Sequence, residues 1–292
     1  MRLLLLTFWA CLPLWLAAEN KDLSNIPEAN TASLAASLQQ VATSPERAPL
    51  SGVVERTYLL GVGYNHVYDS YLSPLDYKGS TLGFTRIGER TMRRGQGRWS
   101  QMTYFDLNAS HLNNPVGSAT TWDGEMQFNY GQHYHVMTQP TWDFSLGGLL
   151  GAHFGGTYNT RNGNNPGQMR MAVDLSASAV AMRQFTLWKK HWTWRTQCDL
   201  PLMGAFFTPN YGQSYYEIFT LGHANENVVF SHPFNAPSMR LISTISIPFG
   251  TSSLTLGYKV DIRQSTAHHL DRHTWHHTFL IGYTKTLQFL KR

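Results

Sequence analysis

Apolar side chains alternate with polar or small ones along most of this chain from residue 53 onward. Residues 169–179 and residues 254–263 show the pattern most clearly, with Met, Val, Leu, Ile and Ala opposite Arg, Asp, Lys, Ser and Thr. A period of two places successive side chains on opposite faces of a β-strand. The runs are longer than the roughly five or six residues of an average strand, and match the roughly 9 to 11 residues of a tilted membrane-spanning strand. The pattern therefore predicts long strands with one apolar face.

Ten such segments follow one another, which is an even number as bacterial outer-membrane barrels require. They begin near Glu55, Ser80, Arg98, Thr120, Thr141, Gln168, His191, Ser238, Ser253 and Thr274. Connections after the odd segments are expected to be long, and lie at residues 73–76, 113–115, 159–167, 208–237 and 265–273. Those after the even segments are expected to be tight. We therefore predict an all-β, up-and-down antiparallel transmembrane β-barrel of about ten strands, with both termini on the periplasmic side.

Charge placement indicates which face lies inside the barrel. The charged side chains on the polar faces are expected to point into the lumen, and they are Arg170, Asp174, Arg195, Lys259, Asp261 and Arg263. They would line a selective channel or lock a closed lumen by ion pairs. Barrels of about eight strands are filled by side chains and those of 16 to 18 hold an aqueous channel, so ten strands favour a largely closed lumen. A soluble β-sandwich or closed barrel is the competing fold, in which the apolar faces form a core.

The N-terminus carries a signal for export. Arg2 precedes an apolar run at residues 3–18, and polar residues follow, which is the form of a cleaved secretory signal peptide. A membrane anchor is the alternative, but the run is short and Pro13 interrupts it. We expect residues 1–18 to be the signal peptide, residues 19–52 a periplasmic leader that forms a linker or a plug, and residues 53–292 the barrel.

Composition excludes several other classes of protein. Only 14% of the 292 residues are charged, while 38 are aromatic, which does not fit a disordered chain or a coiled coil. Removal of the signal leaves one cysteine, Cys198, so no intramolecular disulfide forms. It also leaves 22 basic and 18 acidic residues, without a run of five basic ones. We therefore expect no nucleic-acid partner.

Two predicted outer loops hold candidate ligand-binding residues. The first contributes Tyr211, Gln213, Tyr215, Tyr216 and Glu217, and the second contributes Arg161, Asn162 and Asn164. Aromatic rings with amides and a carboxylate are able to bind a sugar by stacking and hydrogen bonds. The alternative is that the first group closes the lumen and that the second forms ordinary turns, because Asn and Gly are turn-forming residues.

The sequence gives little sign of a metal or catalytic centre. Several of the thirteen histidines cluster near His268 and His277, but no metal-ligand spacing accompanies them. Ser214 lacks the following glycine of a nucleophile elbow. We therefore expect no metal, no cofactor and no catalytic residues.

Three segments resemble an uncharacterised family of exported Gram-negative proteins, catalogued as domain of unknown function 3316. The segments are residues 71–77 (Tyr-Leu-Ser-Pro-Leu-Asp-Tyr), residues 161–166 (Arg-Asn-Gly-Asn-Asn-Pro) and residues 211–219 (Tyr-Gly-Gln-Ser-Tyr-Tyr-Glu-Ile-Phe). The resemblance implies a signal-bearing outer-membrane barrel without an assigned reaction. One departure is that Phe289 is followed by three further residues, whereas such barrels commonly end on an aromatic residue.

The expected function is that of a non-enzymatic outer-membrane barrel that presents extracellular loops. Its expected partners are outer-membrane lipid, lipopolysaccharide and the barrel assembly machinery. Two alternatives remain, a membrane-embedded enzyme that modifies lipid or lipopolysaccharide and a narrow channel for small solutes.

Overall fold

The computed structural model describes residues 53–92, 97–163, 165–224 and 226–288. It contains eleven strands and one short helix among these residues. In chain order they are β1 (Val53–Asp69), β2 (Ser73–Thr91), β3 (Trp99–Asn113), β4 (Thr120–Thr138), β5 (Trp142–Asn159), β6 (Gly167–Leu187), β7 (Lys190–Phe207), α3 (Tyr215–Phe219), β8 (Val228–Ser231), β9 (Met239–Phe249), β10 (Ser252–Ala267) and β11 (Leu270–Gln288). The expectations for residues 1–18, residues 19–52 and Phe289 lie outside the described residues.

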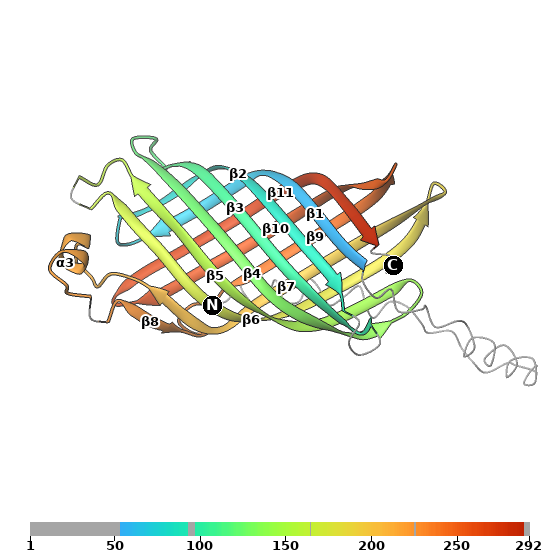
Figure 1. Cartoon of the computed structure of the whole chain (residues 1–292). Coiled ribbons are helices and arrows are strands. Elements are labelled where there is room, and N and C mark those ends of the chain that lie inside the picture. The colour runs from blue at the N-terminus through green and yellow to red at the C-terminus, as the bar shows by residue number, and fades with distance from the viewer. Residues whose placement is uncertain (1–52, 93–96, 164, 225, 289–292) are drawn as a thin grey trace, which may run out of the picture. The chain divides into compact units, whose positions relative to one another are not determined.

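Ten of the strands form a closed antiparallel ring (Figure 1). Each strand pairs with its neighbours in the chain, β7 pairs with β9, and β1 pairs with β11 to close the ring. The four-residue strand β8 adds to the C-terminal end of β7 and is not a member of the ring. The prediction of an up-and-down barrel of ten strands is therefore confirmed. Figure 1 shows α3 and β8 at one end of the barrel and the end of β11 at the opposite end.

Two of the predicted long connections are wrong. β2 begins at Ser73, so only residues 70–72 join it to β1. β10 and β11 meet in a turn of two residues, His268 and His269, which both have positive φ angles. Two such residues make a tight hairpin whose twist matches the strands. The alternation is lost in these segments because the strands continue past the apolar band with polar side chains, which the sequence pattern alone reads as loop.

The exterior of the barrel carries apolar side chains on every strand of the ring. Leu60 on β1 is 65% exposed and Leu82 on β2 is 66% exposed, and comparable side chains follow on β3 to β7 and β9 to β11. A soluble barrel buries such residues, whereas a barrel in a membrane presents them to lipid. The competing soluble fold is therefore contradicted. No helix of the described residues has the length and apolar character needed to cross a membrane.

β7 contains a bulge next to Pro201. Leu175 on β6 pairs with Met203 while Ser176 pairs with Pro201, so one extra residue lies in β7. Proline has no N–H to donate to the ladder, and bulges are among the few places where a strand accepts it. Beyond this bulge β7 leaves β9, whose pairing with it ends at Asp199 and Arg240.

Candidate functional site

An apolar layer crosses the lumen in the half nearer the start of β1 and the end of β11. It consists of seven side chains that point inward and are at most 5% exposed: Leu59, Ile87, Met102, Tyr104, Leu149, Ile242 and Leu280. These side chains come from β1, β2, β3, β5, β9 and β11, so they meet from all around the ring. These packed side chains occupy the lumen at this level of the barrel.

An ion pair between β3 and β10 lies directly above this layer. The Nζ atom of Lys259 lies 2.6 Å from each carboxylate oxygen of Asp106. Thr85 and Asn108 also donate hydrogen bonds to this carboxylate. Lys259 is 0% exposed, so the pair is held entirely away from solvent.

A second charge crosses the lumen from β9. The guanidinium of Arg240 pairs with Asp199, donates a hydrogen bond of 3.0 Å to Asn129 Oδ1 and lies 3.7 Å from the ring centre of Tyr104. This cation–π contact joins the ion pairs to the apolar layer. The ion pairs and the apolar layer together occupy the middle of the lumen.

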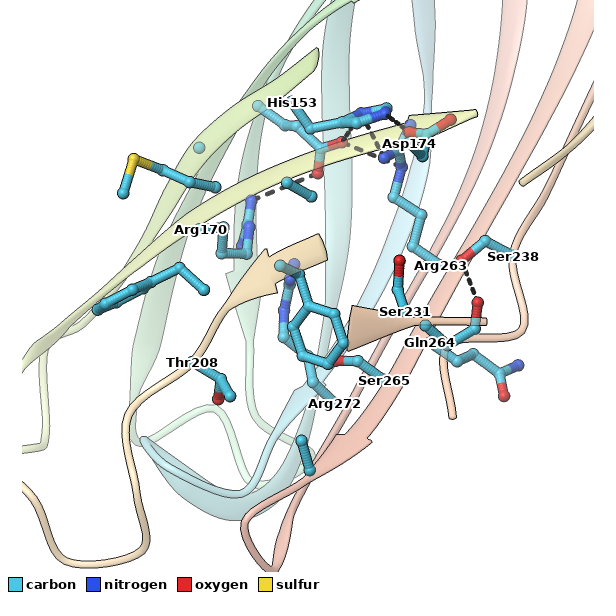
Figure 2. Close-up of a pocket in the computed structure, with 18 of the residues that line it drawn as sticks. His153, Arg170, Asp174, Thr208, Ser231, Ser238, Arg263, Gln264, Ser265 and Arg272 are labelled. Atoms are coloured by element: carbon cyan, nitrogen blue, oxygen red, sulfur yellow. Dashed lines mark hydrogen bonds and ion pairs between the residues drawn. The ribbon is translucent and has the colours of Figure 1, made fainter. Parts of the chain in front are cut away.

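The end of the lumen nearer α3 holds a cavity of about 120 Å³, which we call the outer cavity (Figure 2). Its ionisable lining residues are Asp69, Glu125, His153, Arg170, Asp174, Arg263, Asp271 and Arg272. Arg170 pairs with Asp123 and lies 3.6 Å from Glu125, while the Nε atom of Arg263 lies 3.1 Å from both Glu125 and Asp261. Positive and negative groups are thus paired with each other around the cavity.

His153 is the side chain of this cavity best suited to acid–base chemistry, but both of its ring nitrogens are occupied. Arg263 donates to Nδ1 at 2.5 Å, and Nε2 lies 2.5 Å from Asp174 Oδ2. A guanidinium only donates and a carboxylate only accepts, so Nδ1 is the acceptor and Nε2 carries the proton. The ring has no free nitrogen for a substrate proton, and the arrangement serves to link β5, β6 and β10.

The six charged residues expected in the lumen all lie on the interior face. Arg170, Asp174, Asp261 and Arg263 surround the outer part of the lumen, Lys259 lies at its middle, and Arg195 lies near the opposite end beside Glu89 and Gln197. The structure joins four of them, since Arg263 contacts Asp261 directly, Asp174 through His153 and Arg170 through Glu125.

The residues of the longest connection, between β7 and β9, mainly stabilise its own fold. Ser214 and Glu217 form a capping box at the start of α3, in which each side chain bonds the other's backbone N–H. These hydrogen bonds from Ser214 lower the pKa of Glu217 below its usual 4.5. Gln213 accepts hydrogen bonds from the backbone N–H of Asn210 and from the side chain of Asn227. Ser214 therefore serves as a helix cap.

Tyr71 connects this segment to the turn between β1 and β2. Its hydroxyl donates to the Gln213 carbonyl at 2.9 Å, and its ring meets that of Tyr215 edge to face at 6.0 Å. Partial burial and the nearby Asp69 raise the pKa of Tyr71 to about 12. The Tyr215 hydroxyl accepts from the backbone N–H of Met169 on β6.

The Asn-rich connection between β5 and β6 joins the same assembly. Asn162 donates to the Leu72 carbonyl at 3.1 Å, and Arg161 donates to Ser118 in the β3–β4 connection at 3.1 Å. Asn164 lies outside the described residues. We call the connections containing Tyr71, Ser118, Asn162 and Gln213 the outer platform. Among the described ligand-binding candidates, Tyr211, Tyr216 and Arg161 are exposed, with Tyr211 at 75% and Tyr216 at 63%.

Sequence reasoning missed the apolar layer and the role of Tyr71. A signal for the layer exists, because Leu59, Leu149 and Leu280 each interrupt the alternation by placing an apolar residue on the polar face. Tyr71 lies within a family motif, but its hydrogen-bond partner is 142 residues away and no local pattern identifies it.

The fold is that of a ten-strand β-barrel of the outer-membrane type, with an apolar layer and buried ion pairs inside it. The chain belongs to the family described as "Protein of unknown function (DUF3316)", which matches residues 31–292. The resemblance seen in the three sequence segments is thereby confirmed.

Several solved outer-membrane structures are similar in fold. The outer membrane protease OmpT from Escherichia coli has a TM-score of 0.44 and 6% identity, with 82% of this chain and 97% of OmpT covered. The translocator domain of autotransporter NalP from Neisseria meningitidis has a TM-score of 0.37 and 8% identity, with 87% of this chain and 96% of that domain covered. Ail, the attachment invasion locus protein of Yersinia pestis, has a TM-score of 0.32 and 12% identity, with 80% of this chain and 99% of Ail covered. No curated protein matches the sequence.

Proposed function

We propose that this protein is a non-enzymatic barrel of the outer membrane, with a closed lumen, which presents the outer platform to the cell exterior. Both chain ends lie on the periplasmic side in this proposal, and lipid and lipopolysaccharide surround the wall. The observation that carries the proposal is the apolar layer, whose seven side chains meet across the lumen.

The interior supports a structural role over transport. A channel for small solutes needs a continuous wet path, but the apolar layer and the pairs Lys259–Asp106 and Arg240–Asp199 occupy the lumen one above another. His153 at the outer cavity has both ring nitrogens engaged and is not available as a general base, which argues against an enzyme that uses it.

The outer platform supports a recognition role. Its connections are tied to one another by hydrogen bonds and therefore keep their geometry, while several aromatic side chains remain exposed, among them Tyr211 at 75% and Tyr216 at 63%. Aromatic side chains that are held rigidly and exposed are typical of recognition surfaces. Stacking on such rings suits sugar ligands.

We expect the purified protein to give no single-channel steps in a planar lipid bilayer. The apolar layer excludes hydrated ions, so the native barrel is silent. Replacement of both Leu149 and Leu280 by Gly opens this layer and should produce steps, whereas Leu60→Gly and Leu150→Gly change only the exterior and should not. Conductance steps of one regular size from the native protein would contradict a closed lumen.

We expect a cysteine at position 211 to react with a membrane-impermeant maleimide on intact cells. Tyr211→Cys places the thiol on the outer platform, and Thr251→Cys places one in the exposed turn between β9 and β10 at the opposite end. Both are made in a Cys198→Ser background. Only position 211 should be labelled before the outer membrane is permeabilised. Labelling of position 251 alone would reverse the orientation proposed here.

A further inference from the structure

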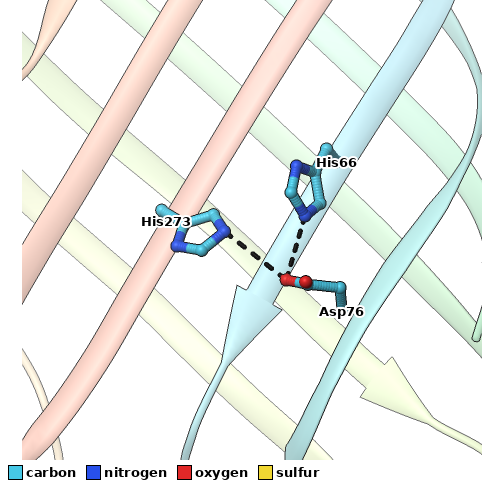
Figure 3. A group of neighbouring side chains, drawn as sticks. All are labelled: His66, Asp76 and His273. Carbon is cyan, nitrogen blue, oxygen red and sulfur yellow. Dashed lines mark hydrogen bonds and ion pairs between the residues drawn. The ribbon is translucent and has the colours of Figure 1, made fainter. Parts of the chain in front are cut away.

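Three potential metal ligands converge on the outer wall of the barrel near its platform end (Figure 3). His66 lies on β1, Asp76 on β2 and His273 on β11. All three side chains point away from the lumen, on strands that lie next to one another. None of the three takes part in the outer cavity or in the ion pairs of the lumen.

The spacing of the ligand atoms suits a small divalent ion. The Asp76 Oδ1 atom lies 2.9 Å from His66 Nε2 and 3.6 Å from His273 Nε2, and all three atoms lie within 4.8 Å of one another. Zinc binds imidazole nitrogen at about 2.0–2.1 Å, so neighbouring ligands of a tetrahedral site lie about 3.3 Å apart. The two measured distances bracket that value.

The sheet holds the two imidazole rings in place. In the β1–β11 register Tyr68 is opposite His273, and His66 is opposite Trp275. The His273 ring stacks on Tyr68 at 5.1 Å, and the Trp275 ring lies 5.9 Å from each of the two imidazoles. Ligands on paired strands with packed rings need little reorganisation to bind an ion.

We propose that His66, Asp76 and His273 form a binding site for a first-row divalent metal, with Zn²⁺ the best match. Two imidazoles and one carboxylate are a common zinc ligand set, and a water molecule supplies the fourth ligand. Imidazole ligands favour zinc, copper or nickel over calcium and magnesium. Sequence analysis expected no metal because these residues have no metal-site spacing along the chain, and the barrel alone brings them together.

The residues around the three ligands indicate a moderate affinity for Zn²⁺. Within the part of the chain that the structure describes, neither imidazole Nδ1 has a hydrogen-bond partner, whereas tight sites usually fix that nitrogen through a second residue. We therefore expect a dissociation constant on the order of 1–10 μM for Zn²⁺, equivalent to about 7–8 kcal/mol.

The test is calorimetric titration of the refolded, tag-free barrel in detergent with Zn²⁺, and separately with Ca²⁺. One Zn²⁺ should bind per chain, and Ca²⁺ should not compete. His66→Ala, His273→Ala and Asp76→Asn should each weaken Zn²⁺ binding by roughly ten-fold or more. Titration with Co²⁺ should give the visible absorption of a four-coordinate ion, and each substitution should abolish it.

His111→Ala is the matched control, because His111 is another exterior histidine that packs on a tryptophan, Trp122, at 4.6 Å. This variant should bind Zn²⁺ as the native barrel does. Every variant is first shown to be folded by its heat-dependent electrophoretic mobility. The proposal is overturned if the native barrel fails to bind Zn²⁺ below about 100 μM, or if His111→Ala weakens binding as much as His66→Ala does.

Discussion

Lys259→Met should be one of the most destabilising single substitutions in this barrel, with a loss of about 3–5 kcal/mol in the free energy of unfolding. The native Nζ atom lies 2.6 Å from both oxygens of Asp106, and the two residues are 0% and 1% exposed. Methionine has a similar length but no charge, so the Asp106 carboxylate stays buried without its counter-ion. Urea unfolding of the barrel in lipid vesicles measures the loss.

A second substitution separates the buried charge from loss of packing. The double variant Lys259→Met with Asp106→Leu removes both charges and should recover most of the lost stability, because a buried ion pair is often replaced by apolar residues without loss. Lys285→Met on the exterior should change the stability by no more than about 0.5 kcal/mol. If the double variant is as unstable as Lys259→Met, the buried charge is not the cause.

Gly282→Ala should prevent the barrel from closing. Gly282 lies opposite Leu59 on the seam where β1 meets β11. An added Cβ atom would lie 1.9 Å from the Tyr58 carbonyl oxygen and 2.8 Å from the Leu59 Cα atom. These are backbone atoms of the paired strand, so relief requires breaking hydrogen bonds of the seam, at a cost of about 3 kcal/mol or more. Heat-modifiable mobility of the extracted protein measures the closed fraction.

Gly124→Ala is the control for this prediction. The nearest atom to its added Cβ is the Asn108 carbonyl oxygen at 3.9 Å, which is an ordinary contact. The Gly124→Ala barrel should therefore close and shift on heating as the native one does. A Gly282→Ala barrel with native mobility and native yield would show that the seam accommodates a side chain.

The fold was largely predictable because its information is local. The period of two is visible within single runs such as residues 169–179, and ten such runs can be counted along the chain. The predicted starts of β2 and β11 lie several residues after the observed starts at Ser73 and Leu270, because strands that extend beyond the lipid lose the apolar alternation. The short strand β8 and helix α3 were missed because each has five residues or fewer.

The candidate site was predictable only in part. The sequence indicated which charged residues share a face, but not that His153 links Arg263 to Asp174. Tyr211 and Tyr216 are exposed, whereas Gln213, Tyr215 and Glu217 from the same motif are used to hold the segment in shape. Hydrogen bonds between distant connections decide this division, and they leave no periodic pattern in the sequence.

The sequence by itself determined the strands, their lipid-facing side and the family, since a period of two and a run of residue types are properties of neighbouring positions. Only the tertiary structure decided which charges pair and which ligands meet. Lys259 and Asp106 are 153 residues apart, and His66 meets His273 only because β1 and β11 close the ring. Closure sets the stagger between strands, and the stagger fixes which side chains lie at the same height within the barrel and on its wall.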